Sequence, residues 1–125
     1  MGIQRKRLGN PEERVQKAVV NYIQLAYPNS LYCASLGGIR TSFKQAIKAK
    51  ATGYVKGFPD LAVYEPMGKY YGLFLEIKSD KKKYATKEQR QWIVDLNKRG
   101  YYACVAKGFD AAREIVDKYF ANKLQ

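Results

Sequence analysis

Histidine is absent from the 125 residues of the chain. This absence excludes every mechanism that needs an imidazole as base, nucleophile or metal ligand, including Ser-His-Asp hydrolysis and zinc sites built with histidine. Any acid–base chemistry must therefore use carboxylates, lysine, tyrosine or water bound to a metal ion.

Cysteine is scarce, since only Cys33 and Cys104 are present. Two thiolates are too few for a zinc site built from four of them. Both cysteines lie in apolar segments typical of a core. We therefore expect two buried free thiols in a reducing compartment rather than a disulfide.

Long hydrophobic runs are also missing. No segment approaches the roughly 18 consecutive apolar residues of a membrane span, and the basic N-terminus lacks the apolar stretch of a signal peptide. We therefore expect a cytoplasmic protein with no membrane partner. The length fits one compact domain. We assign residues 11–125 to this domain and residues 1–10 to a basic N-terminal arm.

Acidic residues are in a minority. The chain has 11 Asp and Glu against 23 Lys and Arg, which gives a net charge of +12 and an isoelectric point near 9.7. Such an excess favours a polyanionic partner, most often nucleic acid, because lysine and arginine that neutralise phosphates release condensed counterions. The alternative is a protein that is basic without having such a partner.

Helix-start signals predict three helices. Asn10 followed by Pro11 is a typical cap and first helical residue, and the apolar spacing predicts a helix over residues 11–27. Thr86 caps a second helix, which ends at an Arg-Gly pair, and Asp110 caps a third.

Four apolar segments are typical of strands. They cover residues 31–35, 60–64, 70–78 and 101–106. The basic stretch between the first two allows a helical turn. The order is therefore α-β-β-β-α-β-α, and the strand-helix-strand crossover implies a parallel pair. These features predict an α/β fold with a central mixed β-sheet flanked by helices.

Three polar residues stand out at the ends of two predicted strands. Glu76 and Lys78 are two positions apart on an otherwise apolar strand, so their side chains share one face. Asp60 opens the preceding strand. If a hairpin joins the two strands, Asp60 and Glu76 lie at the same end of the sheet.

This set of residues suits the hydrolysis of a phosphodiester. Two neighbouring carboxylates repel each other unless a cation lies between them, and oxygen ligands suit Mg²⁺ or Mn²⁺. The backbone carbonyl of Ile77 is a further candidate ligand. Lys78 would stabilise the charge that develops on the phosphoryl group. The structural alternative is a salt bridge between Glu76 and Lys78 at a sheet edge.

An ordered set of motifs resembles a known nuclease family. The motifs are Gly57-Phe58-Pro59-Asp60-Leu61, Leu75-Glu76-Ile77-Lys78, then Gln89, Trp92 and Gly100. They look like the VRR-NUC (virus-type replication-repair nuclease) branch of the PD-(D/E)xK superfamily. The resemblance implies a restriction-endonuclease-like core, a divalent metal held by Asp60 and Glu76, catalysis by Lys78, and an accessory role for Gln89. It implies no small-molecule cofactor.

The same resemblance implies a carboxylate on the N-terminal helix. Glu12 lies on the same helix face as Val15 and Gln16, which should pack inward. We therefore assign the role to Glu12, whose carboxylate could bind the metal directly or through a water molecule. Glu13 stays open as the alternative, although its capping-box position favours a local role.

The basic residues nearest the predicted site are candidates for nucleic-acid contacts. They are Arg40, Lys44, Lys81, Lys82 and Lys83. The alternative for such a lysine run is a solvated loop. Stand-alone members of the resembled family are phage or prophage proteins that cut branched DNA, such as Holliday junctions, as homodimers. Two functions follow: a metal-dependent DNA endonuclease of this kind, or a catalytically silent nucleic-acid-binding module with a nuclease-like fold.

Overall fold

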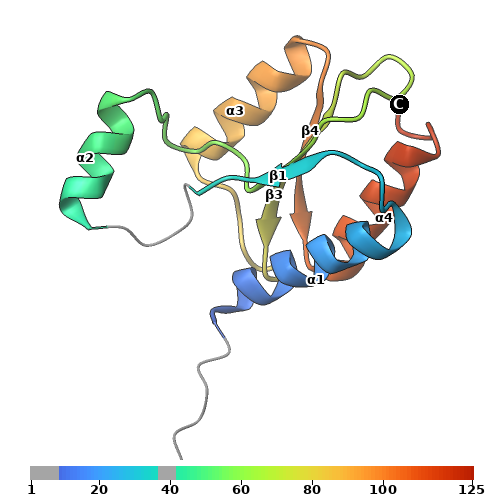
Figure 1. Cartoon of the computed structure of the whole chain (residues 1–125), viewed down its shortest axis with the longest axis horizontal. Coiled ribbons are helices and arrows are strands. Elements are labelled where there is room, and N and C mark those ends of the chain that lie inside the picture. The colour runs from blue at the N-terminus through green and yellow to red at the C-terminus, as the bar shows by residue number, and fades with distance from the viewer. Residues whose placement is uncertain (1–8, 37–41) are drawn as a thin grey trace, which may run out of the picture.

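The computed structural model describes residues 9–36 and 42–125, so Arg40 and residues 1–8 of the predicted N-terminal arm lie outside the described part. The described chain forms eight elements (Figure 1). In chain order they are α1 (Pro11–Ala26), β1 (Tyr32–Ala34), α2 (Phe43–Ala51), β2 (Leu61–Val63), β3 (Leu73–Lys78), α3 (Lys87–Lys98), β4 (Tyr102–Lys107) and α4 (Phe109–Phe120).

The strands form one mixed sheet in the order β1-β2-β3-β4. β1 and β2 pair antiparallel, as do β2 and β3, whereas β3 and β4 are parallel and joined by a crossover through α3. The predicted α/β class, with a central mixed sheet flanked by helices, is confirmed. In the register of the central hairpin, Leu61 faces Leu75, which brings Asp60 next to Glu76.

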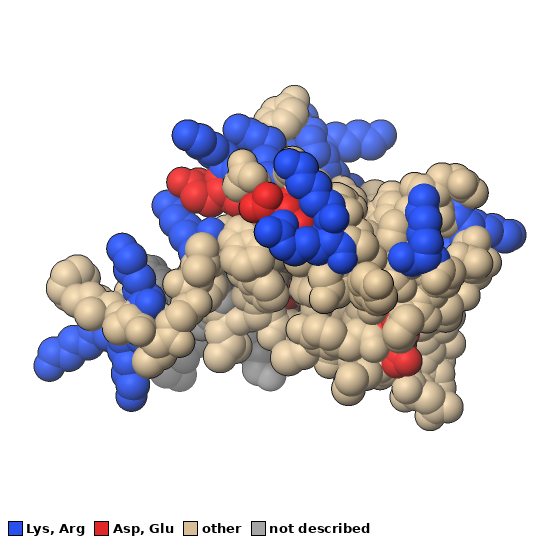
Figure 2. Space-filling view, turned by 90° about the horizontal axis from the view of Figure 1, so that it is seen from above, with Lys and Arg blue, Asp and Glu red and all other residues tan. Residues whose placement is uncertain are grey.

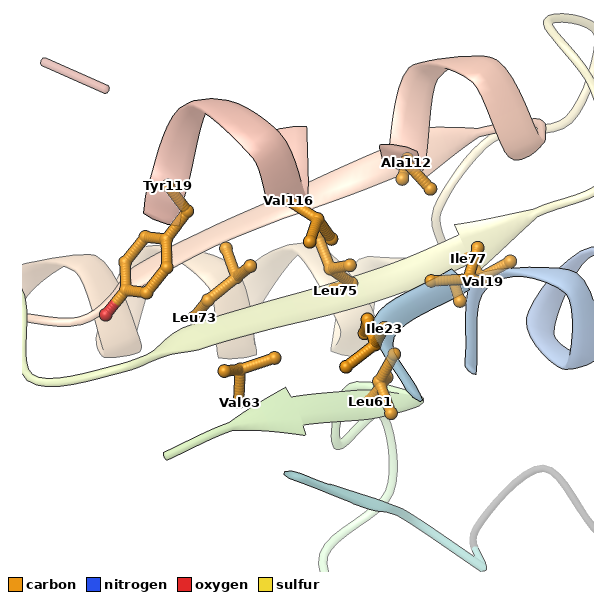
Figure 3. Packing of buried hydrophobic residues seen from close by; sticks show 11 residues of the cluster. Val19, Ile23, Leu61, Val63, Leu73, Leu75, Ile77, Ala112, Val116 and Tyr119 are labelled. Atoms are coloured by element: carbon orange, nitrogen blue, oxygen red, sulfur yellow. The ribbon is translucent and has the colours of Figure 1, made fainter. Parts of the chain in front are cut away.

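Helices cover both faces of the sheet. The larger core lies between the sheet and the pair α1 and α4, and Figure 3 shows its side chains from β2, β3, α1 and α4 pointing toward one another. On the other face Phe74 and Ala103 pack against Leu96 of α3, with Trp92 beside them. Successive side chains of β3 point to opposite faces of the sheet, and helices cover both faces. That strand is therefore buried over its whole length.

Two local predictions from the sequence need correction or extension. The basic stretch between the first two strands contains a full helix, α2, capped by Ser42 and Gln45 in a reciprocal capping box. Asp110 is not a cap, because α4 starts one residue earlier. Its N-cap is Gly108, whose amide donates to the Lys78 carbonyl at the end of β3 and whose φ of 93° turns the chain directly from strand into helix.

The expectation of two buried thiols is wrong for Cys33. This residue is exposed because β1 is a short edge strand. Cys104 is half-buried in β4, and both cysteines are free thiols. Burial raises the pKa of the Cys104 thiol to about 12. None of the described helices is both long and apolar enough to span a membrane.

Candidate active site

The loop that precedes β2 holds Asp60 in position through its contacts with α3. The indole of Trp92 on α3 donates a hydrogen bond to the Lys56 carbonyl at 3.0 Å, and the Phe58 ring packs edge-on against Trp92 with the centroids 5.0 Å apart. Gly57 passes so close to α3 that a Cβ there would lie 2.6 Å from the Glu88 carbonyl carbon. Its φ of +94° also favours glycine. The loop therefore fixes the position of Asp60 against α3.

Glu76 and Lys78 lie at the C-terminal end of β3. Glu76 is 3% exposed and Lys78 is 7% exposed, although every other buried residue of this sheet is apolar. Charged side chains are seldom buried this deeply unless they have partners. The site therefore depends on what surrounds these two side chains.

The partners come from three elements. The Ile77 amide donates to Asp60 Oδ2 at 2.7 Å, which ties the start of β2 to the end of β3. Lys78 Nζ lies 3.7 Å from Glu76 Oε1 and 3.9 Å from Oε1 of Glu12, which comes from the first turn of α1. Two carboxylates thus lie within 4 Å of one ammonium group, and a third, Asp60, lies beside them at the same sheet end.

Burial and like charge disfavour ionisation of the carboxylate pair. Burial, followed by the charge of Asp60, raises the pKa of Glu76 to about 8, against the opposing effect of Lys78. Burial is also the main cause that raises the pKa of Asp60, and the charge of Glu12 adds to it, whereas the bond from the Ile77 amide lowers it. Without a further cation, Glu76 is the carboxyl group that keeps a proton.

The donor set fits a hard divalent cation. When Glu76 is ionised, its buried Oε2 has no hydrogen-bond partner, which leaves an acceptor that a cation would satisfy. Within residues 9–36 and 42–125, no group of three or more Asp, Glu, Cys or His side chains is arranged to hold a metal by itself. A metal here would therefore use Asp60, Glu76 and backbone or water oxygens, as Mg²⁺ commonly does.

The two candidate carboxylates of α1, Glu12 and Glu13, have different partners in the structure. Glu12 reaches Lys78, as described above. Glu13 instead turns back to the helix cap, where its amide donates to Asn10 Oδ1 at 2.9 Å and its carboxylate accepts from Asn10 Nδ2 at 3.3 Å. Glu12 is therefore the α1 carboxylate that the fold brings to Asp60, Glu76 and Lys78.

A groove leads from the carboxylates along α1. It has a volume of about 580 Å³. Its lining comes from one side of α1, from the end of β1 and from Asp60, and includes Glu12, Gln16 and Val20. The groove gives solvent, and a ligand, access to the side of the site that Glu12 and Asp60 form.

The other predicted site residues for which the structure gives a position do not contact the carboxylates. Gln89 closes a capping box at the start of α3, since its Oε1 accepts from the Thr86 amide at 2.8 Å and its own amide donates to the Thr86 hydroxyl. Lys44 lies on α2, and the three lysines 81–83 are exposed in the loop after β3. Arg40 lies outside the described residues.

The packing of the loop before Asp60 against α3 was not recognised from the sequence. Gly57 and Trp92 belong to the motif quoted above, but nothing local shows that one packs against the helix carrying the other. The one available signal was the pairing of a glycine before Phe58-Pro59-Asp60 with a lone tryptophan at a helical position.

The chain is similar to proteins of one known family. The family model described as "VRR-NUC domain" matches residues 6–110. A solved structure titled "VRR_NUC domain protein" is 32% identical in sequence and has a TM-score of 0.71, with 92% of each chain covered. Another, titled "VRR_NUC domain", shares the fold at 23% identity with a TM-score of 0.61, covering 89% of this chain and 99% of the other. No curated protein sequence matches the chain.

Proposed function

Since the chain belongs to the VRR-NUC family of nuclease domains, we propose that it is a divalent-metal-dependent DNA endonuclease that hydrolyses phosphodiester bonds. The observation that carries the proposal is the buried Glu76, whose Oε2 lacks a partner beside Asp60 and Lys78. A purely structural ion pair would not need a second carboxylate at the same place, nor an unsatisfied oxygen.

Each residue has a defined task in this proposal. Asp60, Glu76 and the Ile77 carbonyl would hold Mg²⁺ or Mn²⁺, and Glu12 would reach the ion through water. Such an ion polarises a phosphoryl oxygen and lowers the pKa of water. Lys78, held between Glu12 and Glu76, orients the attacking water and stabilises the negative charge that develops on the phosphoryl group.

Gln89 has an accessory task that its capping bonds permit. Its amide oxygen is engaged by the Thr86 amide. Its amide nitrogen can therefore donate to a phosphate oxygen of the substrate. This assignment comes from the family motif, and its test is whether Gln89→Glu, which retains the capping acceptor but loses the donor, lowers the cleavage rate.

We further propose that the substrate is branched DNA and that the active form is a homodimer. One site cuts one strand, and a four-way junction offers two equivalent strands related by a twofold axis. Two copies related by the same symmetry could therefore cut both strands. Sedimentation velocity of the protein alone and with a junction would measure this state, and a monomer on the junction would contradict it.

A cleavage assay tests the main proposal. Four-way junction, flap, linear duplex and single-stranded DNA are incubated with Mg²⁺, Mn²⁺ or EDTA and with wild type or Glu76→Ala. We expect metal-dependent cutting, best on branched DNA, that the substitution abolishes. Tight binding without cutting under every condition would instead favour the silent binding module.

Two matched variants test the choice of carboxylate on α1. We expect Glu12→Gln to lose most of the activity, because it removes a charge beside Lys78, and Glu13→Gln to keep it. Loss of activity only in Glu13→Gln would reverse the assignment.

A further inference from the structure

The helix α2 stands away from the rest of the molecule. None of its residues is buried, and Figure 1 shows it to one side of the sheet and its covering helices. We call residues 42–56, which comprise the cap, the helix and the following turn, the α2 arm. A nine-residue helix is marginal in water even with good caps, so the arm should gain stability from a partner that covers it.

The uncovered face of the arm is apolar. Phe43 is 82% exposed and Ile47, one turn later, is 53% exposed. Val55 and Tyr54, in the turn after the helix, are 59% and 37% exposed. Single exposed apolar residues are ordinary, but several together on one small element are typical of a binding surface.

The charge of the arm indicates the class of partner. Its charged residues are Lys44, Lys48, Lys50 and Lys56, and no Asp or Glu occurs anywhere between residues 33 and 59. At the left end of Figure 2 the arm shows lysines and uncharged atoms but no acidic ones. A second copy of this chain, with its net charge of +12, would be repelled by this surface. A polyanion would be attracted.

The C-terminal end of the arm is fixed beside the candidate active site, because the Lys56 carbonyl accepts from Trp92 and Phe58 packs on the same ring. The end of β1, which precedes the arm in the chain, is also held there, since the Ser35 amide donates to the Asp60 carbonyl at 2.8 Å. The arm is therefore attached where it can contact a duplex whose phosphate lies at Asp60.

We propose that the α2 arm is the element that recognises a branch in the DNA. This inference rests on the proposed nuclease function. Lys44 and Lys48 bind phosphates, and Phe43 and Ile47 contact bases that are not fully stacked. A continuous duplex hides its base faces, whereas a branch point exposes them to apolar side chains.

A binding assay in EDTA separates this inference from cleavage. Fluorescence anisotropy is measured with a labelled four-way junction and with a linear duplex of the same length. Phe43→Ala with Ile47→Ala is expected to weaken junction binding about tenfold, the value of roughly one base–aromatic contact, and to leave the duplex almost unchanged. Lys44→Ala with Lys48→Ala is expected to weaken both substrates.

A second measurement reports on the bases directly. With 2-aminopurine at the branch point, wild type should raise the fluorescence because the base is unstacked, and the Phe43→Ala, Ile47→Ala variant should not. Leu25→Ala with Val94→Ala is the matched control, since both residues are exposed apolar side chains on other helices. This control should bind like wild type.

Several outcomes would overturn the inference. Equal junction binding by wild type and the Phe43→Ala, Ile47→Ala variant would do so. A change of that variant from dimer to monomer in sedimentation would also do so, because the face would then bind a second copy. Neither substituted side chain is buried, so thermal unfolding should match wild type and confirm a folded variant. If wild type binds junctions selectively but never cuts, the nuclease proposal fails, and the binding of the Phe43→Ala, Ile47→Ala variant still decides whether the arm recognises the branch.

Discussion

At the scale of single residues, Lys78 is the one cation that residues 9–36 and 42–125 place among the three carboxylates Glu12, Asp60 and Glu76. It lies within 4 Å of Glu76 and Glu12, and it is almost fully buried. Because Lys78 is buried, water cannot take the place of its ammonium group. Its single positive charge is therefore the one that is available to the reaction at this position. Its task and that of Asp60 can therefore be separated by experiment.

Lys78→Ala is expected to abolish cleavage while metal binding is retained, because the metal oxygens come from Asp60 and Glu76. Asp60→Asn is expected to weaken metal binding itself by at least about tenfold, since it removes a charged ligand. Isothermal titration with Mn²⁺ and the cleavage assay measure the two effects on the same samples. Normal cleavage by Lys78→Ala would contradict the assignment.

Glu76 gives the metal-free protein a characteristic pH dependence. With a pKa near 8 in the folded state and about 4.5 when unfolded, the folded state holds an extra proton between these values. The free energy of unfolding must then fall as pH rises across this range and level off above it.

We expect wild type in EDTA to lose on the order of 2 kcal/mol more stability between about pH 5 and pH 8 than Glu76→Gln, which stays uncharged. Urea unfolding at both pH values measures the difference. Equal losses in the two proteins would show that Glu76 is ionised without metal.

At the scale of elements, the loop before β2 and the helix α3 act as one support for Asp60. Two glycines with left-handed backbone lie close together in the chain, and only one of them touches α3. A Cβ at Gly57 would meet the α3 backbone, whereas a Cβ at Gly53, with φ +113°, would meet nothing within 4 Å. They therefore form a matched pair.

Gly57→Ala is expected to lower the free energy of unfolding by roughly 3 kcal/mol, because it adds a backbone clash to the cost of the left-handed conformation. Gly53→Ala should cost only the conformational part, about 1 kcal/mol. Chemical unfolding of both variants tests the difference. Similar losses would mean that the loop can move away from α3, and that Asp60 is less firmly held than the packing indicates.

Elements with strong local signals could be predicted from the sequence. The caps at Asn10 and Thr86 fixed the starts of α1 and α3 because their side chains bond to backbone three residues later. Strand alternation and one hairpin were enough to bring Asp60 next to Glu76. These features depend on neighbours in the chain or on a single pairing.

Other features depend on packing between distant segments and could not be predicted. The start of α4 is set by the bond between Gly108 and the end of β3, which outweighs the cap signal at Asp110. The exposure of Cys33 follows from the edge position of β1 in the sheet. The unpaired oxygen of Glu76 follows from how three elements meet, which spacing alone does not show.

At the scale of the whole molecule, charge is distributed between two ends of the sheet. One end carries the carboxylates and, in the loop after β3, the three exposed lysines 81–83. The other end carries the hairpin between β2 and β3 and the last residues of α3 and α4. Contacts between Tyr71 and Gly100, and between Gly68 and Asn122, hold that second end together. The two ends should differ in their importance for DNA binding.

Removal of lysines 81–83 is therefore expected to lower the salt dependence of DNA binding. Each phosphate contact contributes about −0.9 to the slope of log K against log[salt]. The triple variant Lys81→Ala, Lys82→Ala, Lys83→Ala should therefore reduce the magnitude of the slope by roughly two to three units, about one unit per lysine. The control removes three exposed lysines from the opposite end, Lys69, Lys98 and Lys123, and should leave the slope nearly unchanged. Equal effects of the two triple variants would mean that DNA is held by the net charge of the molecule, without preference for the end that carries Asp60 and Glu76.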